Sequence, residues 1–236
     1  MGKKKAVCLL SGGLDSAVAA AICKQQGYDI YALSFNYGQR HNKELLCAKK
    51  IGKHLNVKKH VFFNLDLQQF GGSSLFNQKK QKIPTHEQKK IGSQIPSTYV
   101  PARNTVFLAI ALGFAETCDA DAIFIGANAI DYSGYPDCRP EYIAAVQNMV
   151  NLATKKTIEG KKIIIHAPLL MMTKAEIIKK GLQLGVPFEH TWSCYKGGTK
   201  ACGRCDSCVL RLQGFHQAKI NDPLPYQKKN SPRIQR

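Results

Sequence analysis

The sequence lacks a long apolar run. No segment comes near the ~20 consecutive apolar residues that cross a bilayer. The first apolar stretch, residues 6–10, ends in a glycine pair and is too short for the core of a secretory leader. We therefore expect a cytoplasmic protein without a membrane-spanning segment.

Acidic residues are scarce. There are 16 Asp and Glu against 34 Lys and Arg, which gives a formal net charge of +18. Such a surface attracts polyanions, which include RNA, nucleotides and acidic metabolites. Many lysines come in pairs such as Lys79 and Lys80, a pattern typical of solvated faces, and no segment interleaves basic with aromatic residues as a single-strand platform would. We predict that the protein does not require nucleic acid.

The cysteines are concentrated near one end of the sequence. Disulfides are rare in a reducing compartment, so clustered cysteines there indicate a metal site. Of the nine cysteines, four follow a C-x7-C-x2-C-x2-C pattern: Cys194, Cys202, Cys205 and Cys208. Four thiolates complete a tetrahedral shell with no open position, which predicts one structural zinc ion per chain. An iron–sulfur cluster is the alternative for such a set.

Strand and helix patterns alternate along the chain. Short apolar runs predict strands at residues 6–10, 30–35, 57–65, 122–125 and 163–165, and helical patterns cover 15–26, 42–55, 106–116, 141–155, 173–184 and 208–218. This order predicts an α/β fold with an open parallel five-stranded sheet and helices on both faces. We expect a nucleotide-binding domain at 1–185, with a long surface loop at 66–97 that is a candidate lid. A small zinc-binding helical region at 186–220 and a polar tail at 221–236 follow it.

A glycine-rich loop, residues 11–16, links the first predicted strand to the first helix. Its sequence is Ser-Gly-Gly-Leu-Asp-Ser. The two glycines let backbone amides face an anion, and the helix N-terminus adds its positive end. Asp15 is a candidate partner for magnesium. No Gly-Lys-Ser/Thr follows, so this is not a Walker A loop, and an ordinary strand-to-helix turn is the alternative.

Two further segments are rich in hydrogen-bonding groups. Residues 99–104 precede a predicted helix, and residues 126–140 follow the fourth predicted strand. Ligands of open α/β sheets bind just past the carboxyl ends of strands. The amides, hydroxyls, carboxylates and guanidinium of the second segment suit a purine-like base. The same residue types favour turns, so composition alone leaves both interpretations open.

The loop at 11–16 resembles the SGGxDS loop of the PP-loop ATP pyrophosphatases. That resemblance implies a Rossmann-like, adenine nucleotide alpha hydrolase-like fold and cleavage of ATP between its α and β phosphates. Together with 99–104, 126–140 and the run Thr-Trp-Ser-Cys-Tyr at 191–195, the loop closely resembles the 7-cyano-7-deazaguanine synthase family of queuosine precursor biosynthesis. The likeness extends over about residues 5–217.

This resemblance implies a reaction and an assembly. It implies an ATP-dependent ligase that forms C–N bonds and converts 7-carboxy-7-deazaguanine and ammonia into 7-cyano-7-deazaguanine. The intermediates would be adenylated, and AMP and diphosphate would be released. It also implies a homodimer.

The resemblance further implies residue roles. Asp15, Arg103 and Lys174 would act in catalysis, the last two on charge at the α-phosphate, although a solvated surface lysine is an equal interpretation of Lys174. The ATP-binding segment would comprise Leu10, Ser11, Gly12, Gly13, Leu14, Asp15, Ser16, Ala17, Val18, Ala19 and Ala20. The substrate would contact Asn128, Asp131, Tyr132, Ser133, Asp137 and Arg139, with Arg139 suited to grip a carboxylate.

Two competing functions remain. A tRNA sulfurtransferase of the same PP-loop group would suit the +18 charge, but no separate RNA-binding domain is visible. The other competing function is a zinc-ribbon module that binds nucleic acid and retains a degenerate nucleotide fold. The intact loop at 11–16 argues against this function. ATP-dependent release of diphosphate would distinguish these functions.

Overall fold

The protein was analysed as a computed structural model, which describes residues 2–39, 42–76, 95–129 and 135–227. Its centre is a five-stranded sheet of order β3-β2-β1-β4-β5, in which all neighbouring strands are parallel. The strands are β1 (Lys5–Leu9), β2 (Asp29–Asn36), β3 (Lys59–Asn64), β4 (Ala122–Phe124) and β5 (Ile164–His166). The predicted open parallel sheet is confirmed.

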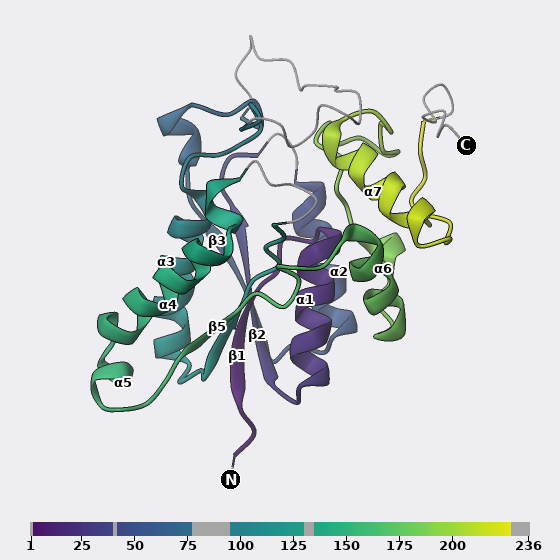
Figure 1. The fold of residues 1–236 in the computed structure, drawn as a ribbon. Coiled ribbons are helices and arrows are strands. Elements are labelled where there is room, and N and C mark those ends of the chain that lie inside the picture. The colour runs from purple at the N-terminus through teal and green to yellow at the C-terminus, as the bar shows by residue number, and fades with distance from the viewer. Residues whose placement is uncertain (1, 40–41, 77–94, 130–134, 228–236) are drawn as a thin grey trace.

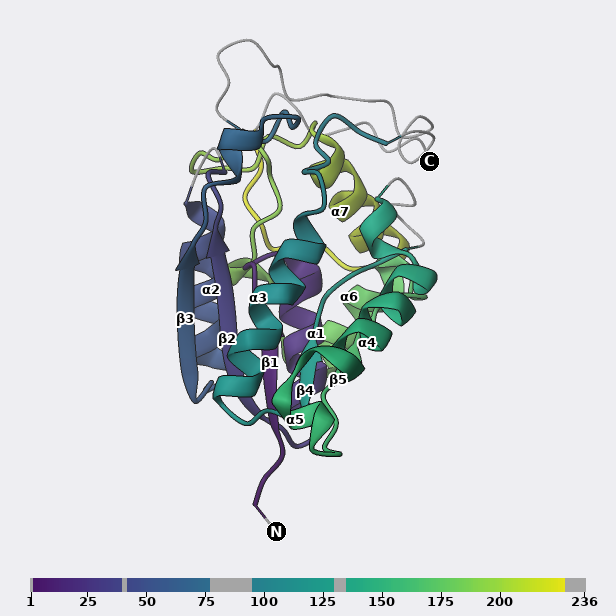
Figure 2. The same ribbon diagram turned by 90° about the vertical axis from the view of Figure 1, so that its left-hand side faces the viewer.

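Helices cover both faces of the sheet (Figures 1 and 2). Alternate side chains of β1 point to opposite sides: Ala6 and Cys8 belong to one core cluster, Val7 and Leu9 to the other. The first cluster includes α1 (Leu14–Gln25), α2 (Lys43–His54) and α6 (Lys174–Gln183), and the second α3 (Arg103–Thr117) and α4 (Pro140–Ala153). The result is a three-layer α/β core.

The remaining elements are short or lie near the C-terminus. They are α5 (Lys155–Ile158), α7 (Asp206–Gln217) and the 3-10 turns η1 (Leu67–Phe70), η3 (Pro136–Cys138) and η4 (Phe188–His190). Both ribbon views show α7 beyond the end of α6 that lies nearest the carboxyl ends of the strands (Figures 1 and 2). The described helices include none that is long and apolar enough to cross a bilayer.

The predicted helix at 141–155 is divided in the structure. It ends at Ala153, because the backbone of Thr154 is extended, with φ −128° and ψ 150°. The Thr154 side chain then accepts a hydrogen bond from the Thr157 amide and caps α5. The predicted capping box of Thr173 and Glu176 is confirmed at the start of α6.

The segment expected to be a surface loop at 66–97 is partly buried. Residues 77–94 lie outside the described part, but Leu67, Ser73 and Leu75 on its N-terminal side are buried. Phe76 is fully buried and pairs in an isolated bridge with Gln39. The expectation of a surface loop is therefore wrong for residues 73–76, because these apolar and small side chains extend the core beyond the sheet edge.

The strand order reverses at β1, since the chain passes from β1 to β2 and β3 on one side and then crosses to β4 and β5 on the other. The loops that follow β1 and β4 therefore diverge at one edge of the sheet, where open α/β folds bind ligands. Gly126, directly beyond β4, lies so close to the first turn of α1 that an added Cβ would be 2.9 Å from the Ser16 amide nitrogen. The two loops are thus held together by close backbone packing.

Candidate active site and metal centre

Hydrogen bonds within the loop at 11–16 fix its shape. The Ser11 hydroxyl donates to the Ser16 hydroxyl at 2.9 Å and accepts from the Gly13 amide at 3.2 Å. The Ser16 hydroxyl in turn donates to the Gly13 carbonyl at 3.0 Å. Gly12 has φ +86°, a conformation that favours glycine, and the Gly13 backbone begins α1. The loop is therefore pre-shaped at a helix N-terminus, where anions bind readily.

Asp15 and Lys174 form an ion pair beside this loop. The Lys174 ammonium donates to both carboxylate oxygens of Asp15, at 2.8 and 2.9 Å. The side chain of Lys174 is 13% exposed and that of Asp15 is 33% exposed, so the pair is partly shielded from solvent. Lys174 comes from the first position of α6, 159 residues along the chain from Asp15. The fold thus brings a cation to the phosphate loop, and Lys174 is not a free surface lysine.

A cavity of about 310 Å³ opens over the carboxyl ends of β1, β2 and β4. Of the residues predicted to bind ATP, six line this cavity: Leu10, Ser11, Gly13, Leu14, Asp15 and Ser16. Gly12 is not among the lining residues, because it faces α2. The other four, Ala17, Val18, Ala19 and Ala20, belong to α1 and are buried in the first core cluster. Lys174 and Arg103 also line the cavity.

Arg103 enters the cavity from the first turn of α3. Its guanidinium carbon lies 6.0 Å from the ring centroid of Tyr37. Burial lowers the pKa of Arg103, but the neighbouring Tyr37, Tyr135 and Asp137 raise it by more, so that the pKa lies above its ordinary value. Arg103 is therefore a permanent positive charge in the cavity.

The residues predicted to contact the substrate separate in the structure. Asn128 lines the cavity, and its side-chain amide donates to the carbonyls of Leu169 and Met172 at 3.0 and 2.5 Å. Asp137 is buried, and its carboxylate accepts from the Asn104 backbone amide at 3.0 Å. Arg139 is exposed and its Nε donates to the Pro136 carbonyl at 3.2 Å. Neither Asp137 nor Arg139 is among the described residues that line the cavity. Asp131, Tyr132 and Ser133 lie outside the described residues.

Sequence reasoning missed the aromatic wall and one carboxylate of the cavity. Phe35 and Phe107 stack with ring centroids 3.9 Å apart and an interplanar angle of 3°, forming an apolar wall. Glu44 lines the cavity from the first turn of α2. Burial raises the pKa of Glu44 to about 7, with Arg103 lowering it and Cys194 raising it further. The only signal in the sequence is the position of Glu44 at the start of the helix that follows a strand, because helical periodicity marks it as a surface residue.

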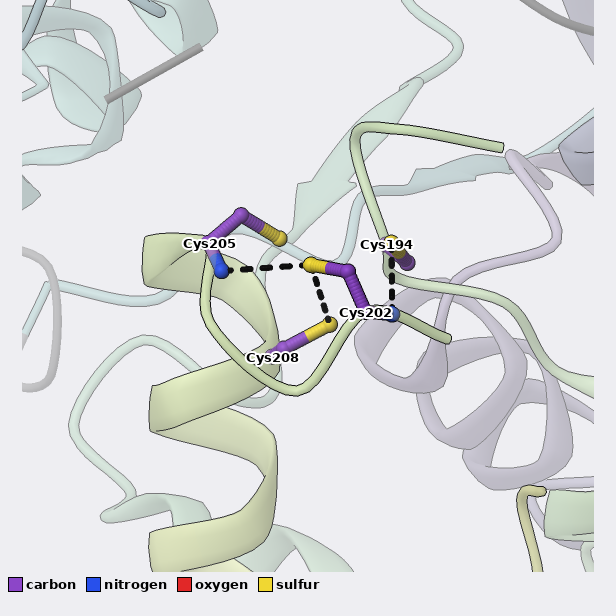
Figure 3. A group of neighbouring side chains, drawn as sticks. All are labelled: Cys194, Cys202, Cys205 and Cys208. Carbon is purple, nitrogen blue, oxygen red and sulfur yellow. Dashed lines mark hydrogen bonds between the residues drawn. The ribbon is translucent and has the colours of Figure 1, made fainter. Parts of the chain in front are cut away.

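The four clustered cysteines converge in the structure (Figure 3). Their Sγ atoms all lie within 4.8 Å of one another, and those of Cys202 and Cys208 are 4.0 Å apart. Tetrahedral zinc with Zn–S bonds of about 2.3 Å requires sulfur atoms about 3.8 Å apart. Backbone amides of Cys202, Arg204 and Cys205 donate to the sulfurs of this cluster at 3.3–3.4 Å. These buried thiols therefore fit a closed metal site.

Trp192 joins the cysteine cluster to the phosphate loop. Its indole Nε1 donates to the carbonyl of Cys194 at 2.9 Å, and its backbone amide donates to the carbonyl of Gly12 at 2.9 Å. The Lys43 ammonium lies 3.4 Å from the Trp192 ring centroid and donates to the carbonyls of Gly198 and Thr199. Contacts thus run without a gap from the cysteines to both the glycine-rich loop and the start of α2.

Comparison with known proteins identifies the family. The family model described as "Queuosine biosynthesis protein QueC" matches residues 5–219. The chain belongs to the QueC family. A 7-cyano-7-deazaguanine synthase from Citrifermentans bemidjiense is 55% identical over 228 residues, which cover 96% of this chain and 99% of that protein. One from Coxiella burnetii is 55% identical over 225 residues, covering 94% and 98%. The predicted family resemblance is confirmed.

A solved structure outside the QueC family has a similar fold. A 4-thiouridine synthetase in complex with RNA and bound ATP aligns with a TM-score of 0.50 and 19% sequence identity, covering 90% of this chain and 53% of that one. This likeness concerns the fold alone.

Proposed function

We propose that the chain is an ATP-dependent 7-cyano-7-deazaguanine synthase of queuosine biosynthesis, which acts on 7-carboxy-7-deazaguanine and ammonia. Membership of the QueC family supports the reaction class. The structural observation that carries the proposal is the Asp15–Lys174 pair beside the preformed glycine-rich loop within one cavity. A cation and a helix N-terminus at the same place suit the phosphates of ATP.

The proposed chemistry explains the need for ATP. A carboxylate resists ammonia because oxide is a poor leaving group. Attack of a carboxylate oxygen on the α-phosphorus forms an acyl adenylate and releases diphosphate, and ammonia then displaces AMP to give the amide. A second adenylation, on the amide oxygen, permits loss of AMP to give the nitrile. One cavity can serve both rounds, because each activates an oxygen on the same carbon.

The phosphate-binding roles follow from position. We propose that the loop of residues 11–16 and Lys174 hold the phosphates, and that Arg103 offsets the charge that develops at the α-phosphate. Asp15 would help to coordinate the magnesium ion that accompanies ATP. Because both Asp15 oxygens accept from Lys174 in the structure, this coordination requires the lysine to turn toward the phosphates.

The base-binding roles are proposed with one change of emphasis. The stacked wall of Phe35 and Phe107 suits the flat face of a deazaguanine. Asn128, Asp131, Tyr132 and Ser133 stay candidates for its polar edge, whereas Asp137 does not line the cavity and is set aside. Arg103 is favoured over Arg139 for the substrate carboxylate, since Arg103 lines the cavity and Arg139 is exposed outside it.

We propose that the cysteine cluster holds one structural zinc ion, and that the chain divides into a nucleotide-binding domain at 1–185, a zinc-binding region at 186–220 and a tail at 221–236. Part of this tail packs on the zinc-binding region, because Tyr226 pairs with Ala201 and Leu224 is buried. We further propose a cytoplasmic homodimer. The nine cysteines, none of which forms a disulfide in the structure, are consistent with a reducing compartment.

The decisive experiment is mass spectrometry of a reaction that contains the protein, ATP, magnesium, ammonium and 7-carboxy-7-deazaguanine labelled with 18O in its carboxylate. The proposal requires the nitrile, diphosphate and two AMP molecules per turnover, each with one 18O atom. Asp15→Asn should form none of these products while keeping the wild-type fold by circular dichroism. Unlabelled AMP, or no nitrile from metal-loaded protein, would refute the proposal. Thiolation of tRNA would then be the next activity to assay.

A further inference from the structure

Glu44 stands at a defined place beside the phosphate loop. It lies in the first turn of α2, the helix that follows β2, and it lines the cavity. Its main chain packs against the loop, because a Cβ added to Gly12 would collide with the Glu44 carbonyl oxygen. The position of this carboxyl group is therefore set by backbone packing.

Among the described residues that line the cavity, only Asp15 and Glu44 carry carboxylates. Asp15 is neutralised by Lys174 through two hydrogen bonds. Glu44, which is half-buried, makes no hydrogen bond or ion pair with the described part of the chain, and Arg103 acts on it only as a neighbouring charge. A carboxylate partly shielded from water without a hydrogen-bond partner is unfavourable, so the site favours a cationic or proton-donating ligand there.

The proposed reaction supplies such a ligand. Ammonia is mainly ammonium at neutral pH. Ammonium loses one proton to water before it can attack, and the ammonia nitrogen loses a second proton as it becomes an amide. Resting on the proposed function, we infer that the Glu44 carboxylate holds the nitrogen nucleophile and accepts the proton that the nitrogen loses as it attacks the acyl adenylate. The C–N bond forms, one N–H proton passes to Glu44, and the C–O bond breaks with its electron pair leaving on AMP.

The experiment separates adenylation from nitrogen transfer in the full-length, metal-loaded protein. Three rates are measured for wild type, Glu44→Gln, Glu44→Asp and a control, Glu189→Gln, whose residue is exposed and outside the cavity lining. They are substrate-dependent exchange of diphosphate into ATP, formation of amide plus nitrile at increasing ammonium, and formation of hydroxamate from hydroxylamine. Hydroxylamine is largely unprotonated at neutral pH and is the stronger nucleophile, so it needs less help from a base.

General base catalysis is worth about 100-fold or more, so Glu44→Gln should lose about that factor in amide plus nitrile. It should keep exchange and hydroxamate formation within about threefold of wild type, and Glu44→Asp should recover part of the loss. Undiminished use of ammonia by Glu44→Gln would overturn the inference. An equal loss of diphosphate exchange would also overturn it, because Glu44 would then act in adenylation or in maintaining the shape of the phosphate loop. If wild type itself shows no substrate-dependent exchange, the proposed function fails instead.

Discussion

Replacing Gly12 by alanine should destabilise the whole domain, whereas the same change at the neighbouring Gly13 should not. Gly12 has φ +86°, and a Cβ there would collide with the Glu44 carbonyl and lie 2.6 Å from the Ala48 amide nitrogen. These are main-chain atoms of a helix and cannot turn aside. Gly13 has φ −78°, and its added Cβ would make ordinary contacts with the Ser11 hydroxyl at 3.4 Å and the Trp192 carbonyl oxygen at 3.8 Å.

The magnitude follows from two contributions. A left-handed backbone costs a residue with a Cβ about 1–2 kcal/mol. Overpacking against atoms that must shift adds about 1–3 kcal/mol. Gly12→Ala should therefore lower the free energy of unfolding by about 2–5 kcal/mol, which for a chain of this size is a fall in Tm of about 4–20 °C. Gly13→Ala changes only the N-cap residue of α1. It should lower the free energy of unfolding by up to about 1 kcal/mol.

The assay is thermal unfolding of both variants and wild type at equal metal content, together with ATP binding by calorimetry. Gly12→Ala should show the larger fall in Tm. Gly13→Ala should lose no more than about 4 °C in Tm yet bind ATP more weakly, because Gly13 lines the cavity. Equal losses of stability in the two variants would refute the close approach of α2 to the loop.

Three other changes test separate parts of the structure. Chelation, or Cys194→Ser, should release one metal ion per chain, as elemental analysis would show, while the control variant Cys118→Ser should retain its metal. Metal loss should lower the free energy of unfolding by about 10 kcal/mol and weaken ATP binding, as measured by calorimetry. Lys174→Met should lower kcat/KM for ATP by about 10²–10³, and a loss no larger than that of the exposed Lys179→Met would count against its role. Burial lowers the pKa of His60 from 6.5 to about 4, so only the unfolded state takes up its proton as pH falls below 6.5. Stability should then drop by up to about 1.4 kcal/mol per pH unit down to about pH 4 in denaturant titrations, and His60→Gln should abolish that part of the drop.

Features that depend on residues close in sequence were predictable. Apolar runs and helical periodicity are local properties, and they predicted all five strands and the order of the principal helices. The capping box of Thr173 and Glu176 and the spacing of the cysteines are also local, so the start of α6 and the metal cluster could be predicted. Boundaries were less predictable, as at Thr154, where one extended residue divides a continuous helical pattern.

The composition of the cavity could only be decided by tertiary structure. Glu44 follows a helical pattern that marks it as exposed, and it lines the cavity only because α2 packs on Gly12. The sequence pattern of Lys174 equally fits a surface lysine, and only the fold shows that it pairs with Asp15. Arg103 and Arg139 are distinguished only by the structure, in which Arg103 lines the cavity. Periodicity and spacing act within a few residues, whereas burial and ion pairing join segments distant in sequence, 159 residues apart for Asp15 and Lys174. The sequence by itself therefore determined the framework and the metal ligands, and only packing decided which charges meet at the phosphate loop.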